Sequence, residues 1–145
     1  MLVGLKIRIL RMNDDLASLV DLWLENVKET NYRVPDAYNI LSRRRQNGED
    51  ILIANLDSRD VGYAMGKNYD GVYTSQGIFV THNLRKRGIA SALKEEQIDI
   101  ARQQNCFEFR TEIFGDNPAS VALQRRFGFN LKHFNDTYKA RLVLY

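Results

Sequence analysis

The chain has 145 residues and a mass of 16.8 kDa, which suits one domain and leaves too little for two of ordinary size. Its composition, with 44% hydrophobic and 27% charged residues, is that of a globular domain and excludes disordered, collagen-like and low-complexity chains. The net charge of +3 argues against a dedicated nucleic-acid partner, and one cysteine with two distant histidines argues against a disulfide framework or a metal site.

The first half of the sequence predicts four strands and two helices. Residues 6–10 alternate in polarity, which is typical of a half-buried strand. The polar residues 13–15 can cap a helix over residues 16–28, whose apolar side chains fall on one stripe. Pro35 opens a second helix, which ends at residue 46 before an Asn-Gly pair. Strands follow at residues 51–56, 61–67 and 72–80, with turns at 57–60 and 68–71.

The second half alternates helices and strands. A long helix is predicted over residues 88–105, where Ile89 and Leu93 share an apolar face and Ile98 lies off that face. The pair Asn117-Pro118 is a strong helix start, because Asn caps a helix and Pro suits its first turn. That helix ends at Gly128. Strands are predicted at residues 107–113, 129–134 and 138–144.

This order of elements predicts the fold class. A strand, a helix and a strand over residues 72–113 favour one parallel pair within an otherwise antiparallel sheet. We therefore expect an α/β (α+β) fold over residues 1–145, a single domain with a central mixed, mostly antiparallel sheet of six to seven strands flanked by helices. The sequence has no apolar run near the ~20 residues of a membrane span and no signal-peptide pattern, which predicts a cytoplasmic protein without a membrane partner.

A basic loop stands between the strand at 72–80 and the long helix. The start of a helix presents unpaired N–H groups and the positive end of its dipole. Gly88 and the small Ala90 allow an anion to approach this backbone, and Arg85, Lys86 and Arg87 add positive charge. The loop therefore predicts a seat for a phosphate or pyrophosphate. It matches neither the Walker loop nor the Rossmann glycine motif.

Two segments together are similar to those of a known family. Residues 85–90, Arg-Lys-Arg-Gly-Ile-Ala, resemble the Gln/Arg-x-x-Gly-x-Gly/Ala signature of the GNAT family of N-acetyltransferases. Residues 117–129 resemble that family's Asn-x-x-Ala/Ser-x-x-Leu-Tyr-x-x-x-Gly-Phe segment. The resemblance covers residues 72–130 and implies a GNAT-like fold.

The resemblance also implies a reaction and a co-substrate. Such a chain binds acetyl-CoA, with the pyrophosphate on the basic loop and the pantetheine arm beside the strand at 72–80. A primary amine then attacks the thioester directly in a ternary complex, with neither a metal nor a covalent enzyme intermediate. The residues implied in cofactor binding are Ile78, Phe79, Val80, Arg85, Lys86, Arg87, Gly88, Ile89, Ala90, Ser91, Asn117 and Ser120.

Two positions depart from the family pattern. Gln124 stands where many relatives carry a Tyr that protonates the thiolate of coenzyme A, and Gln is not a general acid. Thr74 stands where some relatives carry a glutamate base. We therefore consider Glu112 and Glu25 as candidate bases and Tyr138 as a candidate acid.

The acceptor expected from the resemblance is a small-molecule or peptide amine, and a homodimer is common in the family. Two other functions remain open. The departures at residues 74 and 124 are compatible with a non-catalytic acyl-CoA-binding or regulatory module on the same fold. The arginines at 43–45 and the basic loop at 85–87 are compatible with a nucleic-acid-binding domain. Such a domain would bind oligonucleotides with a steep dependence on salt.

Overall fold

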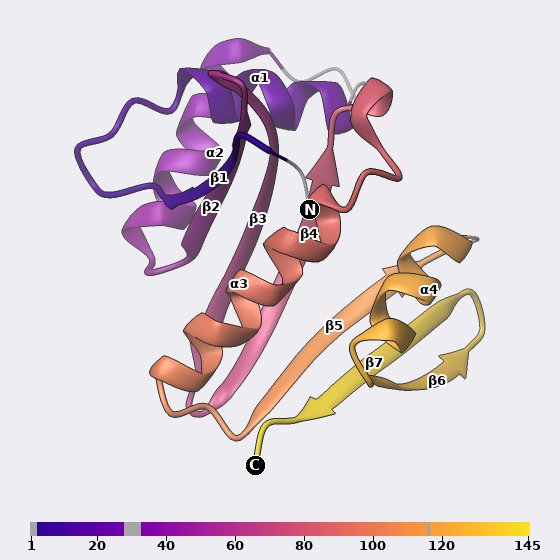
Figure 1. Ribbon diagram of the computed structural model, residues 1–145. Coiled ribbons are helices and arrows are strands. Elements are labelled where there is room, and N and C mark those ends of the chain that lie inside the picture. The colour runs from indigo at the N-terminus through magenta and orange to yellow at the C-terminus, as the bar shows by residue number, and fades with distance from the viewer. Residues whose placement is uncertain (1–2, 28–32, 116) are drawn as a thin grey trace.

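The computed structural model describes residues 3–27, 33–115 and 117–145, and within them one seven-stranded sheet flanked by helices (Figure 1). The strand order is β1-β2-β3-β4-β5-β7-β6, and the pair β4–β5 is parallel while its neighbours pair antiparallel. The predicted fold class and the predicted parallel pair are therefore confirmed. The elements are β1 (Leu5–Ile9), α1 (Ala17–Asn26), α2 (Val34–Gln46), β2 (Asp50–Leu56), β3 (Arg59–Tyr69), β4 (Val72–Val80), α3 (Ile89–Gln103), β5 (Glu108–Phe114), α4 (Pro118–Arg126), β6 (Asn130–Phe134) and β7 (Thr137–Val143).

The hairpins β2–β3 and β3–β4 turn more tightly than the sequence predicts. Asp57 and Ser58 both have positive φ angles (49° and 68°), as do Asp70 and Gly71 (51° and 93°). Two successive residues of this kind form the turn whose twist suits a two-residue hairpin. The strand β3 therefore extends beyond the predicted 61–67 at both ends. The last residue of the predicted helix 16–28 lies outside the described residues.

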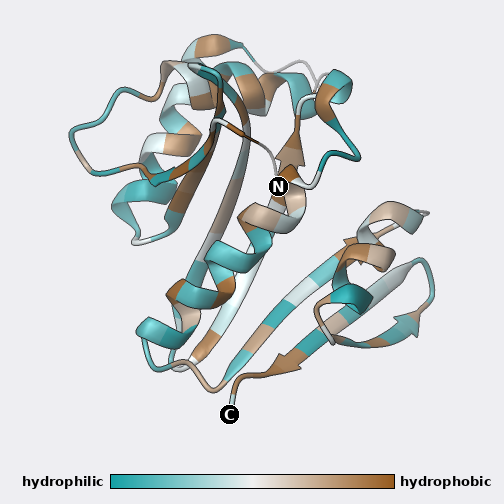
Figure 2. Ribbon diagram, viewed as in Figure 1, coloured by the Kyte–Doolittle hydropathy of each residue, from teal (hydrophilic) through white to brown (hydrophobic). Residues whose placement is uncertain are grey.

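Alternation along the central strands builds two cores. In β2, Ile51 and Ile53 face α1 and α2, whereas Leu52 and Ala54 face α3. All four side chains are fully buried, because helices cover both faces of this half of the sheet. Figure 2 shows hydrophobic residues along β2 and more hydrophilic ones on the outward side of α3. None of the described helices is long and apolar enough to cross a membrane.

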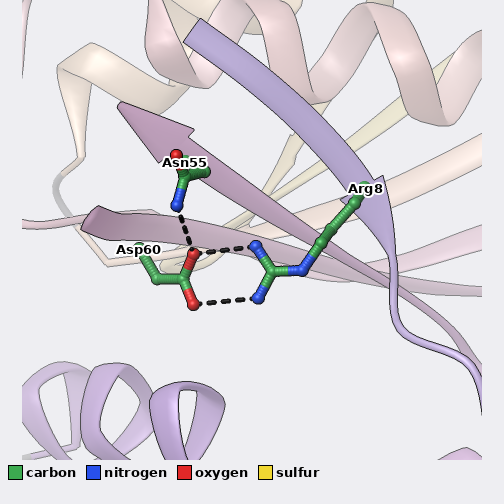
Figure 3. A network of polar contacts seen from close by, with 3 residues as sticks. All are labelled: Arg8, Asn55 and Asp60. Atoms are coloured by element: carbon green, nitrogen blue, oxygen red, sulfur yellow. Dashed lines mark hydrogen bonds and ion pairs between the residues drawn. The ribbon is translucent and has the colours of Figure 1, made fainter. Parts of the chain in front are cut away.

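An ion pair fastens the edge strand β1 to the sheet (Figure 3). The Arg8 guanidinium donates to both carboxylate oxygens of Asp60, at 2.8 and 2.9 Å. Asn55 Nδ2 donates a third bond to Asp60, at 3.0 Å. The hydrogen bonds from Arg8 lead the causes that lower the pKa of Asp60 to about 2, although partial burial opposes them.

The buried face of α3 differs from the predicted one. Ile98 lies in the core beside Leu93, although periodicity places it off the apolar stripe. Lys94 and Gln97 are also fully buried. The reason is that α3 contacts the sheet through β3 and β4 while Phe109 and Phe129, from the C-terminal half, close over another side of it.

Candidate active site

The parallel strands β4 and β5 separate soon after they meet. They are paired only at Val72–Glu108, Tyr73–Phe109 and Thr74–Arg110. Beyond that point β4 stays paired with β3 as far as Val80, and β5 stays paired with β7 as far as Phe114. The sheet is thus split into two halves that diverge, as the ribbon of Figure 1 shows.

A bulge in β4 lies where the two strands part. Gly66 pairs with Ser75 and the preceding Met65 with Gly77, so Gln76 is an extra residue in β4. Gly77 takes a φ of 128°, a conformation that suits glycine. The bulge resets the alternation of the strand, so that Ile78 joins the α3 side while the next residue packs toward α1 and α2.

One large cleft occupies the space between the two halves and continues over the mouth of α3 and along α4. Ten of the twelve residues predicted to bind the cofactor line it: Ile78, Phe79, Val80, Arg85, Lys86, Gly88, Ala90, Ser91, Asn117 and Ser120. The other two differ. Ile89 is buried in the core, and Arg87 is exposed but absent from the lining of the cleft.

The mouth of α3 has the backbone of an anion seat. Lys86 and Gly88 have positive φ angles of 63° and 87°, and Gly88 is the N-cap residue. No side chain caps the first turn of this helix, so its N–H groups point toward the loop. Arg85 Nε donates to the carbonyl oxygen of Val80 at 3.1 Å, and its guanidinium lies 5.6 Å from the centre of the Phe79 ring. The arginine therefore holds the loop against the end of β4.

The helix α4 forms the facing wall. Asn117 Oδ1 accepts a hydrogen bond from the N–H of Ser120 at 3.1 Å, which confirms the predicted cap. Arg126 Nη2 donates to Ser91 Oγ at 3.1 Å and so links α4 to the first turn of α3. These contacts set the two helix ends on either side of the cleft.

The three candidate catalytic residues do not converge on one point of the cleft, although Glu112 and Tyr138 lie on the neighbouring strands β5 and β7. Glu112 lines the cleft, and its position in β5 is directly opposite Lys139 in β7. Glu25 is an exposed residue on α1 that accepts a hydrogen bond from the hydroxyl of Thr81 at 3.3 Å. The Tyr138 ring stacks on His133 at 4.4 Å. Among the described residues, the lining of the cleft includes neither Glu25 nor Tyr138.

Several residues that line the cleft were not among the predicted site residues, and Asn26 and Lys94 are two of them. Asn26 Nδ2 donates to the Tyr63 hydroxyl at 2.8 Å. Lys94 Nζ lies 4.4 Å from the ring centres of both Phe109 and Phe129, and burial lowers its pKa to about 7. The helical pattern gives no signal for this burial, because Lys94 directly follows Leu93 and so points about 100° away from it around the helix.

Gln124, which the resemblance aligns with a catalytic tyrosine, also lines the cleft. It is buried on α4, and its Oε1 has no hydrogen-bond partner among the described residues. A buried amide oxygen without a partner is uncommon in folded proteins, because burial removes its water. The cleft wall between α3 and α4 therefore contains unsatisfied polar atoms.

The comparisons with known structures agree on the fold. An N-acetyltransferase from Staphylococcus aureus Mu50 is 18% identical, with 97% of this chain and 99% of that chain covered and a TM-score of 0.82. A ribosomal-protein-alanine N-acetyltransferase from Brucella melitensis is 23% identical (95% and 99% covered, TM-score 0.78). An acetyltransferase structure from Salmonella typhimurium with its cofactor acetyl-CoA is 18% identical (98% and 95% covered, TM-score 0.79).

The sequence comparisons identify the family. The model of the acetyltransferase (GNAT) family matches residues 16–129, which is most of the chain. No curated protein sequence matches significantly. The chain belongs to the GNAT acetyltransferase family.

Proposed function

We propose that this member of the acetyltransferase family transfers an acetyl group from acetyl-CoA to a primary amine. The observation that carries the proposal is the parting of β4 and β5 after Thr74–Arg110, which opens a cleft that extends to the uncapped mouth of α3. A parallel pair that separates leaves one edge of β4 unpaired, and the anion seat fixes one end of a ligand there. A site with an anion-binding loop at one end and an unpaired strand edge beside it suits a molecule with a pyrophosphate and an extended arm.

In the proposed complex the pyrophosphate contacts the backbone N–H groups of residues 85–90. Arg85 and Lys86, which line the cleft, add positive charge, whereas Arg87 contributes through its main chain and by longer-range attraction. The arm lies along residues 78–80 as an added strand would. Asn117 and Ser120 contact it from α4.

The proposed reaction is a direct transfer. The amine nitrogen attacks the thioester carbon, and a backbone N–H near Phe79 or Val80 holds the oxyanion that develops. Glu112, which lines the cleft, accepts the proton of the amine, because a protonated amine has no lone pair for attack. Glu25 remains the alternative base, since its contact with Thr81 places it at the end of β4.

The proposal also covers the acceptor, the extent of the catalytic domain and the oligomeric state. The acceptor is a small-molecule or peptide amine, and the likeness to the Brucella melitensis ribosomal-protein-alanine N-acetyltransferase favours including peptides in its search. Residues 1–145 act as one acyltransferase domain in the cytoplasm. The proposed assembly is a homodimer.

Calorimetric titration with acetyl-CoA and with CoA tests the binding. We expect saturable binding to both molecules, and no binding at high micromolar protein would refute the proposal. Release of thiol from acetyl-CoA over a panel of polyamines, amino acids, aminoglycosides and peptides then tests the transfer. Tight CoA binding without transfer to any amine would instead identify a binding or regulatory module, an outcome that Gln124 in place of a tyrosine keeps open.

A further inference from the structure

We propose that Lys94 is the general acid of the transfer and donates a proton from Nζ to the sulfur of the departing coenzyme A. This inference rests on the proposed function, because it needs a thioester in the cleft. Its basis is the place of Lys94 in the cleft wall, at the level where β4 and β5 part.

The level of Lys94 along the cleft follows from a neighbouring contact. Ser75 on β4 donates from its hydroxyl to Gln97 Oε1 at 3.2 Å, so these two residues lie side by side. The helix α3 runs back along β4 (Figure 1), and Lys94 precedes Gln97 by about 4.5 Å of helix. A strand rises ~3.3 Å per residue, which places Lys94 beside Gly77, just past the last β4–β5 pair.

The amine of Lys94 has no partner of its own. Its side chain is fully buried, and Nζ has no hydrogen-bond partner among the described residues. The two aromatic rings beside it offer a cation–π attraction and no hydrogen-bond acceptor of the usual kind. A buried ammonium that lines a cleft without a partner is therefore available to a ligand in that cleft.

The surroundings of Lys94 explain its acidity. The two side chains beside its Nζ, the rings of Phe109 and Phe129, carry no charge. Burial alone lowers its pKa to about 7.

Tyr73 and Arg126, two charged or titratable groups of the packed elements, have hydrogen-bond partners elsewhere. Tyr73, whose ring lies 5.2 Å from that of Phe109, donates its hydroxyl to Asp50 at 3.1 Å. Arg126 on α4 donates to Ser91. Cys106 is buried after the end of α3, and burial raises its pKa. None of these four groups contributes to the shift at Lys94.

Bonds, electrons and protons balance in the proposed step. A carbon–nitrogen bond forms, the carbon–sulfur bond breaks, and the electron pair of that bond stays on sulfur. An ammonium with a pKa of about 7 gives its proton to a thiolate whose thiol has a pKa of about 8.5, so the transfer is downhill. The proton lost by the amine passes through Glu112 to solvent, and Lys94 is protonated again from solvent.

The residue at position 124 is consistent with this assignment. Gln124 occupies the position at which the resemblance implies an acidic tyrosine, and its amide has no proton to give at neutral pH. Tyr138, the acid considered from the sequence, stacks on His133 instead and does not line the cleft. Lys94 on α3 lines the cleft and has a proton that it can donate in place of that tyrosine.

The test compares the substitution Lys94→Met with wild type and with the double variant Lys94→Met, Gln124→Tyr. Met keeps the length and packing of the side chain without its charge. We expect kcat to fall about 100-fold, the lower end for loss of a general acid, because a thiolate is a fair leaving group. In wild type we expect kcat to decline above pH 7, where Lys94 loses its proton, and in Lys94→Met this decline should disappear. The calorimetric affinity of the variant for CoA should stay within about threefold of the wild-type value. The tyrosine of the double variant should raise kcat at least tenfold above that of Lys94→Met alone.

Gln97→Met is the matched control, since it removes a buried polar group one turn away that has no ionisable proton. This variant should keep the decline of kcat above pH 7. The assignment fails if Lys94→Met keeps both the wild-type kcat and that decline, or if its loss is confined to KM or to thermal stability without rescue by Gln124→Tyr. Failure of wild type to bind acetyl-CoA would refute the proposed function itself, before Lys94 is tested.

Discussion

Lys94 Nζ lies 4.4 Å from the centre of the Phe109 ring, and the ring of Phe129 lies at the same distance. The two rings meet edge to face, with 5.5 Å between their centres. The lysine therefore joins α3 to the half of the sheet beyond the split. Burial removes water from around this ammonium and lowers its pKa to about 7.

The first prediction concerns the stability that this burial removes. The pKa of Lys94 is about 7 in the folded protein against an ordinary 10.5, so the unfolded chain binds more protons between these values. Stability therefore rises with pH across this window. Lys94→Met should stabilise the fold at pH 6 by on the order of 4 kcal/mol, and the gain should shrink toward pH 10. Urea unfolding of both proteins at pH 6, 8 and 10 measures it, and parallel profiles would contradict the prediction.

The second prediction concerns the ion pair that fastens β1. The pKa of Asp60 is held at about 2, below its ordinary 3.8, so the pair stabilises the fold above pH 4 and is lost as pH falls from 4 to 2. Because the side chain of Arg8 is 47% exposed, Asp60→Asn should destabilise by only about 1 kcal/mol at pH 7 and low salt. The difference from wild type should vanish near pH 2 or in 1 M salt. An undiminished difference in acid would show that the loss is not electrostatic.

The third prediction concerns the mouth of α3. Gly88 has a φ of 87°, and a methyl group at this position would meet no other atom within 4 Å, so Gly88→Ala adds backbone strain without a clash. We expect a loss of about 1 kcal/mol in stability and a weaker affinity for acetyl-CoA, because the strained loop moves its N–H groups.

Gly128→Ala is the control for this change. Gly128 has a similar φ of 83° and similar open space, but it follows α4 outside the cleft. Thermal melting should show comparable losses for the two variants, whereas calorimetry should show weaker acetyl-CoA binding for Gly88→Ala alone. Equal affinities would mean that the loop does not hold the phosphates.

The fourth prediction separates the two candidate bases. Glu112→Gln should lower kcat by about 100-fold, since its carboxylate lines the cleft and the variant cannot accept a proton. Glu25→Gln should change kcat less, because its carboxylate already accepts the Thr81 hydroxyl. Steady-state rates with one amine acceptor at several pH values decide between them. The reverse ranking would assign the base to α1.

Local patterns in the sequence determined the order of elements, the parallel pair and the starts of α3 and α4. Gly88 before an apolar helix and Asn117 before Pro118 are short-range signals, because capping and backbone conformation depend on neighbours in the chain. The apolar run Ile51 to Ala54 likewise predicted a strand, and all four side chains are buried. These features need no knowledge of distant residues.

Only the tertiary structure decided which side chains meet in the cleft. The extra residue Gln76 shows in the register of β3 with β4, and the split beyond Thr74 depends on which partner each strand keeps. Lys94 carries a charge that periodicity would place near solvent, yet it is buried because Phe109 and Phe129 arrive from a half of the chain that the helix pattern does not contain. Burial is a property of the whole assembly, and it is burial that makes this lysine acidic.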